Sequence, residues 1–219
     1  MEIQKYIDHT NLNMAATSKD IEKLCHEAIQ YGFHSVCIHP FYVSLAKELL
    51  KDSNVSVCTV IGFPLGMTTP KTKVFEAVDA LENGADEFDM VINVGALKDK
   101  DYEYVKREIE DIRDVLEGKT LKVIIETSLL TEKEIEKMTE ICNETFVNYI
   151  KTSTGFGARG VSLEDIDIIN RKKNDVLEIK ASGGIKSLDF TVQLIEKGVT
   201  RIGTSSAVSI MKEEEHETI

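Results

Sequence analysis

Residues 177–206 read LEIKASGGIKSLDFTVQLIEKGVTRIGTSS, and this stretch decides the fold. It opens with a short apolar run, Leu177–Ser182, which predicts a β-strand. A helix is expected next, beginning at its N-cap Ser187 and ending at Gly198. A second short run, Thr200–Thr204, predicts another strand. Both strands are largely apolar, which is typical of a parallel sheet that is covered on both faces.

The same order of strand and helix extends over most of the 219 residues. Six further strands are expected, which makes eight in all, at Lys5–Thr10, Ser35–His39, Val55–Gly62, Glu87–Val94, Leu121–Thr127 and Asn148–Ser153. Amphipathic helical patterns lie between them, with N-cap residues at Ser18, Thr131 and Ser162. Eight units of roughly 27 residues each fit a lean (β/α)₈ TIM barrel, an α/β fold with a single domain. An open, doubly wound sheet is the main alternative, but the G-x-G-x-x-G turn that usually follows its first strand is missing from this sequence.

The barrel domain is expected to span residues 1–211, because no low-complexity linker divides the chain. Lys212–Ile219 (KEEEHETI) is acidic and is expected to be a frayed, solvated tail. Met1 leads directly into charged residues, and no stretch approaches the ~20 apolar residues needed to cross a bilayer. The cysteines form no C-x-x-C pair, so we expect buried free thiols, in a reducing cytoplasm, at Cys25, Cys37, Cys58 and Cys142.

The formal net charge is −12, and 29% of the residues are charged. A nucleic-acid-binding surface would usually appear as clustered Lys and Arg, so this balance argues against such a partner. A small anionic substrate remains compatible with it, because a binding site needs only a local positive potential.

Three charged residues lie inside apolar strands, where an ionised group needs a reason to be buried. Asp89 interrupts F-D-M-V-I, Lys151 interrupts Y-I-K-T, and Lys180 interrupts L-E-I-K-A. The two lysines come late in their strands, and strand ends of this kind face the site in a TIM barrel. Lys122, in contrast, opens its strand and is expected to be solvated at the bottom face, like Lys5. The alternative is that the three residues have only a structural role. In that case the two lysines would extend their ammonium groups to solvent at the rim, and Asp89 would hold a loop in place.

Two lysines that approach each other in one barrel mouth have a chemical use. A nearby cation and partial burial both disfavour a protonated ammonium, so Lys151 could act as a neutral amine and attack an aldehyde. Asp89, directly or through a water molecule, could move the protons that iminium and enamine formation require. The pattern therefore indicates Schiff-base chemistry.

Glycines and hydroxyl residues follow the last two strands. The seventh strand ends in Ser182-Gly183-Gly184, and the eighth ends in Gly203-Thr204-Ser205-Ser206 before a short helix at Val208–Met211. TIM barrels commonly bind phosphate with these two loops and a short helix N-terminus. Glycine lets backbone N–H groups approach an oxyanion, and serine adds hydroxyl donors. Simple tight turns and a helix cap are the alternative interpretation.

Seven segments resemble, in the expected order, motifs of the deoxyribose-phosphate aldolase family, and the resemblance runs from Asp8 to about Met211. These segments are IGFPLG (61–66), KVFEA (73–77), ENGADE (82–87), DMVINVGAL (89–97), KVIIETSLL (122–130), KTSTGF (151–156) and KASGG (180–184). The resemblance implies a class I aldolase that reversibly cleaves 2-deoxy-D-ribose 5-phosphate to D-glyceraldehyde 3-phosphate and acetaldehyde, with no metal or other cofactor. We also expect a homo-oligomer, a dimer or a tetramer.

The resemblance also implies residue roles. Lys151 would form the Schiff base, Asp89 would donate and accept protons, and Lys180 would perturb Lys151. Residues near the substrate hydroxyl groups would be Asp8 and Thr10. The residues around the phosphate would be Gly155, Gly183, Gly184, Gly203, Ser205 and Ser206.

The sequence departs from the family pattern at Asn11 and Asn13 after the opening D-H-T, at Arg159 in the loop after Phe156, and at Ala207. These departures bear on substrate preference rather than on the reaction. Two other functions compete with the aldolase. A barrel that only binds a phosphometabolite would not need to keep the lysines and Asp89 together. A metal-dependent aldolase or epimerase would need histidines at ligand spacing, which His9, His26, His34, His39 and His216 do not show.

Overall fold

A closed barrel forms the centre of the computed structural model, which describes residues 1–217. All eight strands are parallel, each pairs with the next, and the eighth pairs back with the first. The predicted (β/α)₈ barrel is therefore confirmed. The strands are β1 (Ile7–Asn11), β2 (Ser35–Ile38), β3 (Ser56–Ile61), β4 (Glu87–Val91), β5 (Thr120–Ile124), β6 (Tyr149–Lys151), β7 (Glu178–Ser182) and β8 (Arg201–Thr204).

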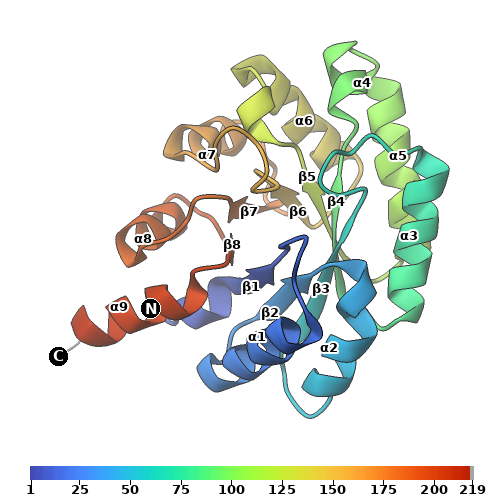
Figure 1. Cartoon of the computed structure of the whole chain (residues 1–219). Helices are drawn as coiled ribbons and strands as arrows, with labels where there is room; N and C mark the ends of the chain where they lie inside the picture. The colour runs from blue at the N-terminus through green and yellow to red at the C-terminus, as the bar shows by residue number, and fades with distance from the viewer. Residues whose placement is uncertain (218–219) are drawn as a thin grey trace.

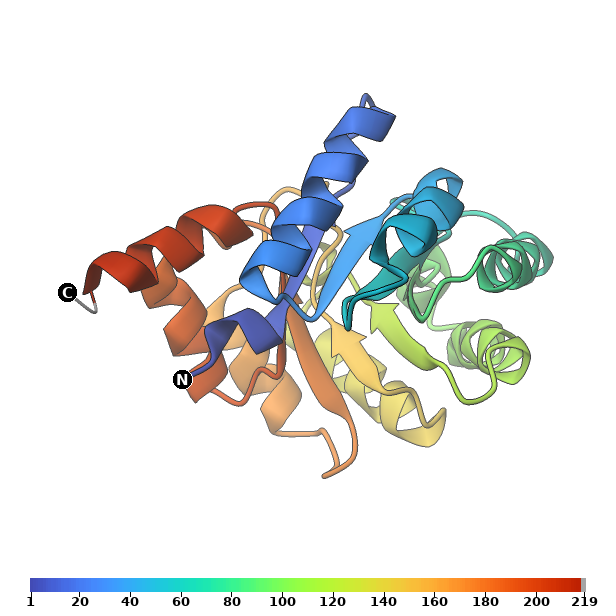
Figure 2. The ribbon, with the colours of Figure 1, turned by 90° about the horizontal axis from the view of Figure 1, so that it is seen from below.

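Helices surround the strands on all sides (Figure 1). The α-helices are α1 (Ser18–Tyr31), α2 (Val43–Leu50), α3 (Pro70–Glu82), α4 (Val94–Lys98), α5 (Tyr102–Val115), α6 (Glu132–Glu144), α7 (Leu163–Asn170), α8 (Leu188–Glu196) and α9 (Ala207–Glu217). Short 3₁₀ turns are found at η1 (Ile3–Tyr6), η2 (Pro40–Tyr42) and η3 (Thr127–Leu129). In Figure 2 the N-terminus and helix α9 lie on the same side of the barrel.

The helix starts follow from their capping residues. Thr131 and Ser162 form capping boxes with the residues three positions later, and Ser187 accepts a hydrogen bond from the Phe190 backbone, as predicted. The N-cap of α1 is Thr17 rather than Ser18. Asp20 lies three residues after Thr17, which is the spacing at which its carboxylate can bind back to the cap.

The two ends of the chain differ from the expectation. β1 begins at Ile7 rather than Lys5, because Ile3–Tyr6 form a 3₁₀ turn on which Lys5 is exposed. The tail that was expected to fray from Lys212 continues α9 through Glu217, and the Glu213 carboxylate accepts a 2.7 Å hydrogen bond from the Leu188 backbone. Thr218 and Ile219 lie outside the described residues.

Apolar side chains fill the layer between strands and helices, whereas the barrel interior is largely charged. The apolar group inside the barrel comprises Leu12, Cys37, Cys58 and Val60, with Phe63 beside it. Seven buried ionic side chains also lie in the interior, and they are Asp8, Glu87, Asp89, Lys122, Lys151, Lys180 and Arg201. Branched aliphatic residues usually fill this space, and buried ions cost stability unless they are paired. The charges therefore point to the functional site.

Candidate active site

Strand pairing brings the two predicted lysines together. Lys151 in β6 and Lys180 in β7 are direct partners in the register of the barrel. Their Nζ atoms meet at one carboxylate oxygen, because Asp89 Oδ2 lies 2.8 Å from Lys151 Nζ and 2.7 Å from Lys180 Nζ. Lys180 and Asp89 are fully buried, and the Lys151 side chain is 3% exposed. The structure thus brings all three predicted catalytic residues into contact.

Lys122 is the main correction to the sequence analysis. It was expected to be solvated at the bottom of the barrel, but its side chain is fully buried. Its Nζ atom lies 2.8 Å from Asp89 Oδ1 and 2.6 Å from Glu87 Oε2, and it donates to Cys58 Sγ at 3.3 Å. β5 begins at Thr120, so Lys122 is its third residue and pairs with Asp89 in the register of the barrel.

The lysines keep the carboxylates ionised. Burial alone would raise the pKa of Asp89, but the ammonium groups of Lys122, Lys151 and Lys180 outweigh it and hold the pKa well below its usual range. Burial alone would lower the pKa of Lys180, but the carboxylates of Asp8 and Asp89 raise it. Asp89 is thus a carboxylate that can accept a proton, and Lys180 is an ammonium that can donate one.

Asp8 lies deeper in the barrel than the substrate-contact role implied by the resemblance would suggest. It is fully buried, with Oδ2 2.5 Å from Lys180 Nζ and Oδ1 3.0 Å from Arg201 Nη1. Arg201 also donates to Glu87 Oε2 at 2.8 Å and to the Tyr149 hydroxyl at 3.2 Å. Asp8 therefore anchors Lys180 from below.

The cations of this cluster differ in how many carboxylates they contact. Lys122, Lys180 and Arg201 each lie within ion-pair distance of two or more carboxylates. Lys151 contacts Asp89. Lys151 is therefore the member with the fewest ionic contacts, and it is also the one that reaches the cavity above the cluster.

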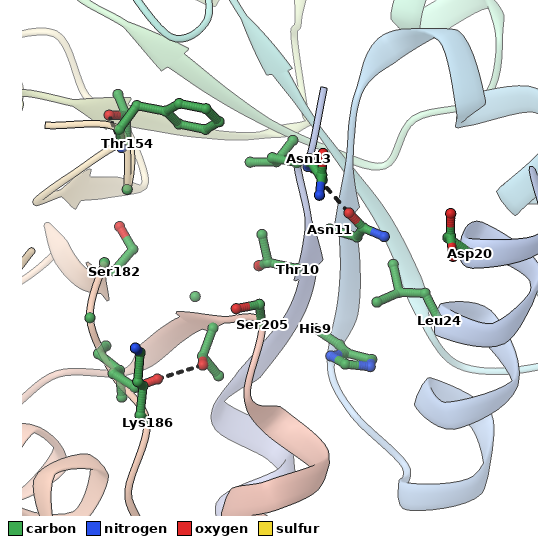
Figure 3. Close-up of a pocket in the computed structure, with 18 of the residues that line it drawn as sticks. His9, Thr10, Asn11, Asn13, Asp20, Leu24, Thr154, Ser182, Lys186 and Ser205 are labelled. Atoms are coloured by element: carbon green, nitrogen blue, oxygen red, sulfur yellow. Dashed lines mark hydrogen bonds between the residues drawn. The ribbon is translucent and has the colours of Figure 1, made fainter. Parts of the chain in front are cut away.

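A cavity of about 670 Å³ opens above Lys151 at the carboxyl ends of the strands. Loops after β1, β6, β7 and β8 line it, and Figure 3 shows Thr10, Ser182 and Ser205 around its centre. Lys186 also lines the cavity and supplies a cation that the sequence analysis did not single out. The volume is sufficient for a small sugar phosphate.

Three of the predicted phosphate residues have a backbone suited to an anion. Gly155, Gly183 and Gly184 all have positive φ, at 88°, 83° and 75°, in the region that glycine adopts without strain. A Cβ atom on Gly155 or Gly184 would have no heavy atom within 4 Å among the described residues, so these glycines face open space. Successive residues of this kind turn their N–H groups into an anion-binding concavity.

The other phosphate candidates are placed differently. Ser205 lines the cavity, whereas the Ser206 backbone N–H donates to Thr204 Oγ1 at 2.9 Å. Gly203 lines the cavity, but it also lies against the buried ion cluster, since a Cβ there would stand 3.1 Å from Lys180 Cε. Ser182 donates its hydroxyl to the Ser153 carbonyl at 2.6 Å. A side chain at position 203 would therefore be crowded by Lys180 and Ser182.

The segment after β1 contributes polar side chains to the edge of the cavity. Asn11 Oδ1 accepts a 3.2 Å hydrogen bond from the Asn13 backbone, and both side chains line the cavity (Figure 3). The Thr10 hydroxyl donates to the Asp8 carbonyl at 2.8 Å.

All four cysteines are free and buried, as predicted. A hydrogen bond from Cys58 lowers the pKa of the Cys37 thiol to about 7 against the opposing effect of burial.

Among residues 1–217, two groups of side chains are close enough together to be considered as metal ligands. One is Cys37, Cys58 and Asp89, and the other is Asp8, Cys58 and Glu87. Each group includes at least one carboxylate that already lies 2.5–2.8 Å from a lysine ammonium group. A metal ion would have to displace these ammonium groups, so the residues present favour lysine chemistry.

The chain resembles known proteins over almost its whole length. Residues 3–207 match the model of the family described as DeoC/LacD family aldolase. A deoxyribose-phosphate aldolase of Thermococcus gammatolerans is 53% identical over 216 residues, which cover 97% of this chain and 96% of that one. One from Metamycoplasma hominis is 57% identical over 197 residues, covering 90% of this chain and 91% of that one.

Solved structures show the same similarity. The structure described as a tetrameric deoxyribose phosphate aldolase from Aeropyrum pernix superimposes with a TM-score of 0.89 at 31% identity. The match covers 97% of this chain and 91% of that one. In addition, no helix among residues 1–217 is both long and apolar enough to cross a membrane.

Proposed function

The chain belongs to the DeoC/LacD family of aldolases, and we propose that Lys151 is its Schiff-base lysine. The reaction is the reversible cleavage of 2-deoxy-D-ribose 5-phosphate to D-glyceraldehyde 3-phosphate and acetaldehyde. The contact of Lys151 Nζ with Asp89 Oδ2 at 2.8 Å, on the floor of the cavity, is the observation that supports this assignment. An intact lysine and carboxylate in contact argue against a barrel that only binds a phosphometabolite.

The proposed reaction begins when the Lys151 ammonium passes a proton to the Asp89 carboxylate, 2.8 Å away, and the resulting neutral amine attacks the aldehyde carbon C1 of the open-chain sugar. Loss of water from the resulting carbinolamine gives an iminium. The C3 hydroxyl then loses its proton and becomes the aldehyde carbonyl of D-glyceraldehyde 3-phosphate, which leaves as the bond between C2 and C3 breaks. The electron pair of that bond forms the C1–C2 double bond of an enamine, and the π electrons of the iminium move to its nitrogen. Protonation at C2 and addition of water release acetaldehyde and restore the amine.

Asp89 and Lys180 supply the proton transfers in this proposal. Asp89 is ionised and touches both Nζ atoms, so it can accept a proton near the reacting amine. Lys180 is protonated and can donate one to the departing hydroxyl of the carbinolamine or to C2. Asp8 and Lys122 hold Lys180 and Asp89 from below.

The phosphate is proposed to bind at the loops after β6, β7 and β8. The positive-φ glycines Gly155, Gly183 and Gly184 support this assignment, and Ser205 adds a hydroxyl to the same wall. Gly203, which lines the same wall, and Ser206, which follows Ser205, would complete the surroundings of the phosphate. Thr10 would contact a substrate hydroxyl, since it reaches the cavity, whereas Asp8 would act through Lys180.

A homo-oligomer is proposed on the strength of the Aeropyrum pernix relative, which is described as a tetramer. A cytoplasmic location is proposed from the four buried free thiols, since a reducing compartment preserves them.

Borohydride trapping tests the Schiff-base assignment. The protein is mixed with acetaldehyde, reduced, digested and mapped by mass spectrometry, and we expect an ethyl group on Lys151. Lys151→Leu should give no adduct, whereas removal of an exposed lysine, as in Lys71→Leu, should leave the adduct unchanged. An ethyl group on Lys180 alone would show that the assignment is wrong.

A further inference from the structure

The loop from Gly155 to Gly160, after β6, lies directly against the proposed phosphate loop. A Cβ atom on Gly160 would stand 1.9 Å from the Gly183 carbonyl oxygen, so the two backbones are in contact. The Val161 backbone N–H reaches the carbonyl oxygens of Ser182 and Gly183, both at 3.2 Å. The position of Gly160 thus fixes the position of Gly183.

Arg159 fastens this loop to the start of α7. Its guanidinium donates two hydrogen bonds to the Asp165 carboxylate, from Nη1 at 2.6 Å and from Nη2 at 2.9 Å. We call this bidentate pair the Arg159–Asp165 fork. Nη1 also donates to the carbonyl oxygen of Gly160 at 2.9 Å. Asp165 is itself held in place, because it accepts from the Thr127 hydroxyl at 2.9 Å and from the Ser162 backbone at 3.0 Å.

The loop needs such an attachment because of its composition. Three of its six residues, Gly155, Gly157 and Gly160, are glycines, which have the most backbone freedom to lose. Exposed ion pairs contribute little to structure, but here the carboxylate partner is 3% exposed and the contact is bidentate. Arg159 itself stands outside the lining of the cavity.

We infer that Arg159 is a positioning residue for the substrate phosphate. Its fork to Asp165 holds Gly160 against Gly183 and so keeps the Gly183 and Gly184 amides turned toward the cavity. The inference rests on the proposed phosphate site. It adds a specificity determinant for the phosphorylated sugar, outside the catalytic cluster and outside the groups that touch the anion.

The test compares two substrates in two variants and a matched control. Arg159→Leu removes the fork, and Arg159→Lys keeps a charge but cannot reproduce the planar geometry. Arg171→Leu is the control, because it removes another arginine–carboxylate pair near the C-terminal end of α7, with Glu132. Steady-state kinetics are measured with 2-deoxyribose 5-phosphate and with 2-deoxyribose, together with competitive inhibition by inorganic phosphate and thermal unfolding.

Arg159→Leu should raise KM for the phosphorylated sugar by about tenfold, the equivalent of one displaced charge-assisted hydrogen bond. The inhibition constant for inorganic phosphate should rise by the same factor. Both kcat and the kcat/KM for 2-deoxyribose should stay within about twofold of wild type, because 2-deoxyribose has no phosphate and Arg159 does not touch the reacting atoms. A twofold change corresponds to much less than one such hydrogen bond. Arg159→Lys should fall between Arg159→Leu and wild type, and Arg171→Leu should match wild type.

Equal losses for both sugars, or a fall in Tm without a change in KM for the phosphorylated sugar, would overturn the inference in favour of a purely structural role. If Arg159→Leu does not fold, the same comparison in Arg159→Lys decides between these outcomes. Failure of the underlying phosphate site is distinguishable. In that case the wild-type protein itself would neither favour the phosphorylated sugar nor be inhibited by inorganic phosphate.

Discussion

Lys122→Met tests the ion cluster inside the barrel. Methionine has a similar length but no charge, so the change leaves Glu87 and Asp89 without the ammonium that lies 2.6 and 2.8 Å from them. Removing one partner of a buried ion pair costs roughly 3–5 kcal/mol, because the other charge stays buried. In a domain of this size each kcal/mol lowers Tm by about 2–4 °C, so we expect a fall of roughly 6–20 °C.

The assay is thermal and urea unfolding followed by circular dichroism, with Lys47→Met as the matched control. Lys47 Nζ lies 2.8 Å from Asp86 Oδ1, but its side chain is 46% exposed. Exposed pairs of this kind are worth less than about 1 kcal/mol, so the control should lose little stability. A loss in Lys122→Met no larger than that in Lys47→Met would refute the claim of a charged interior.

A double-mutant cycle with Glu87→Gln separates the ion pair from general damage. If Lys122 and Glu87 interact directly, the double variant should lose less stability than the two single losses together, with a coupling of roughly 0.5–3 kcal/mol. Strict additivity would show that Lys122 stabilises the barrel in some way other than through Glu87.

Three further predictions concern catalysis, the phosphate and acid stability. Lys180→Leu should slow borohydride trapping and aldol cleavage steeply while the adduct stays on Lys151, and unchanged trapping rates would contradict a role for the shared Asp89 oxygen. Wild-type kcat/KM should favour 2-deoxyribose 5-phosphate over 2-deoxyribose by about 100-fold or more, since two or more charge-assisted hydrogen bonds are lost without phosphate, and equal values would exclude the site. Lys122, opposing burial, lowers the pKa of Glu87 from 4.5 to about 2, which contributes about 3 kcal/mol of stability. That stability is fully present above pH 4.5 and is lost as the pH falls through about 2, so Tm should drop less steeply with acid in Glu87→Gln than in wild type, and parallel curves would argue against it.

The sequence predicted the fold well because its signals are local. Each strand, and the caps at Thr131, Ser162 and Ser187, depends on residues within a few positions of one another. The proposed catalytic residues could also be singled out from the sequence, because a charge near the end of an apolar strand is conspicuous. Lys151, Lys180 and Asp89 all meet as expected.

The interior contacts could not be predicted in the same way. Lys122 was misplaced because its strand begins one residue earlier than its apolar run, which moves it into register with Asp89. Glu87 and Arg201 were missed because each begins a strand, where a charged residue usually reaches solvent. Their burial follows from partners on other strands, and a single sequence does not reveal which distant strands become neighbours.

The position of Asp8 has a consequence for how the chain can fold during synthesis. Asp8 leaves the ribosome early, whereas its partners Lys180 and Arg201 follow 172 and 193 residues later. Until they appear, β1 has neither its closing neighbour β8 nor compensation for a buried carboxylate. A nascent chain that ends before Arg201 should therefore leave the first strand undocked and open to protease. Because Asp8 pairs with Lys180 and Arg201, the native barrel can close only after Arg201 has been synthesised.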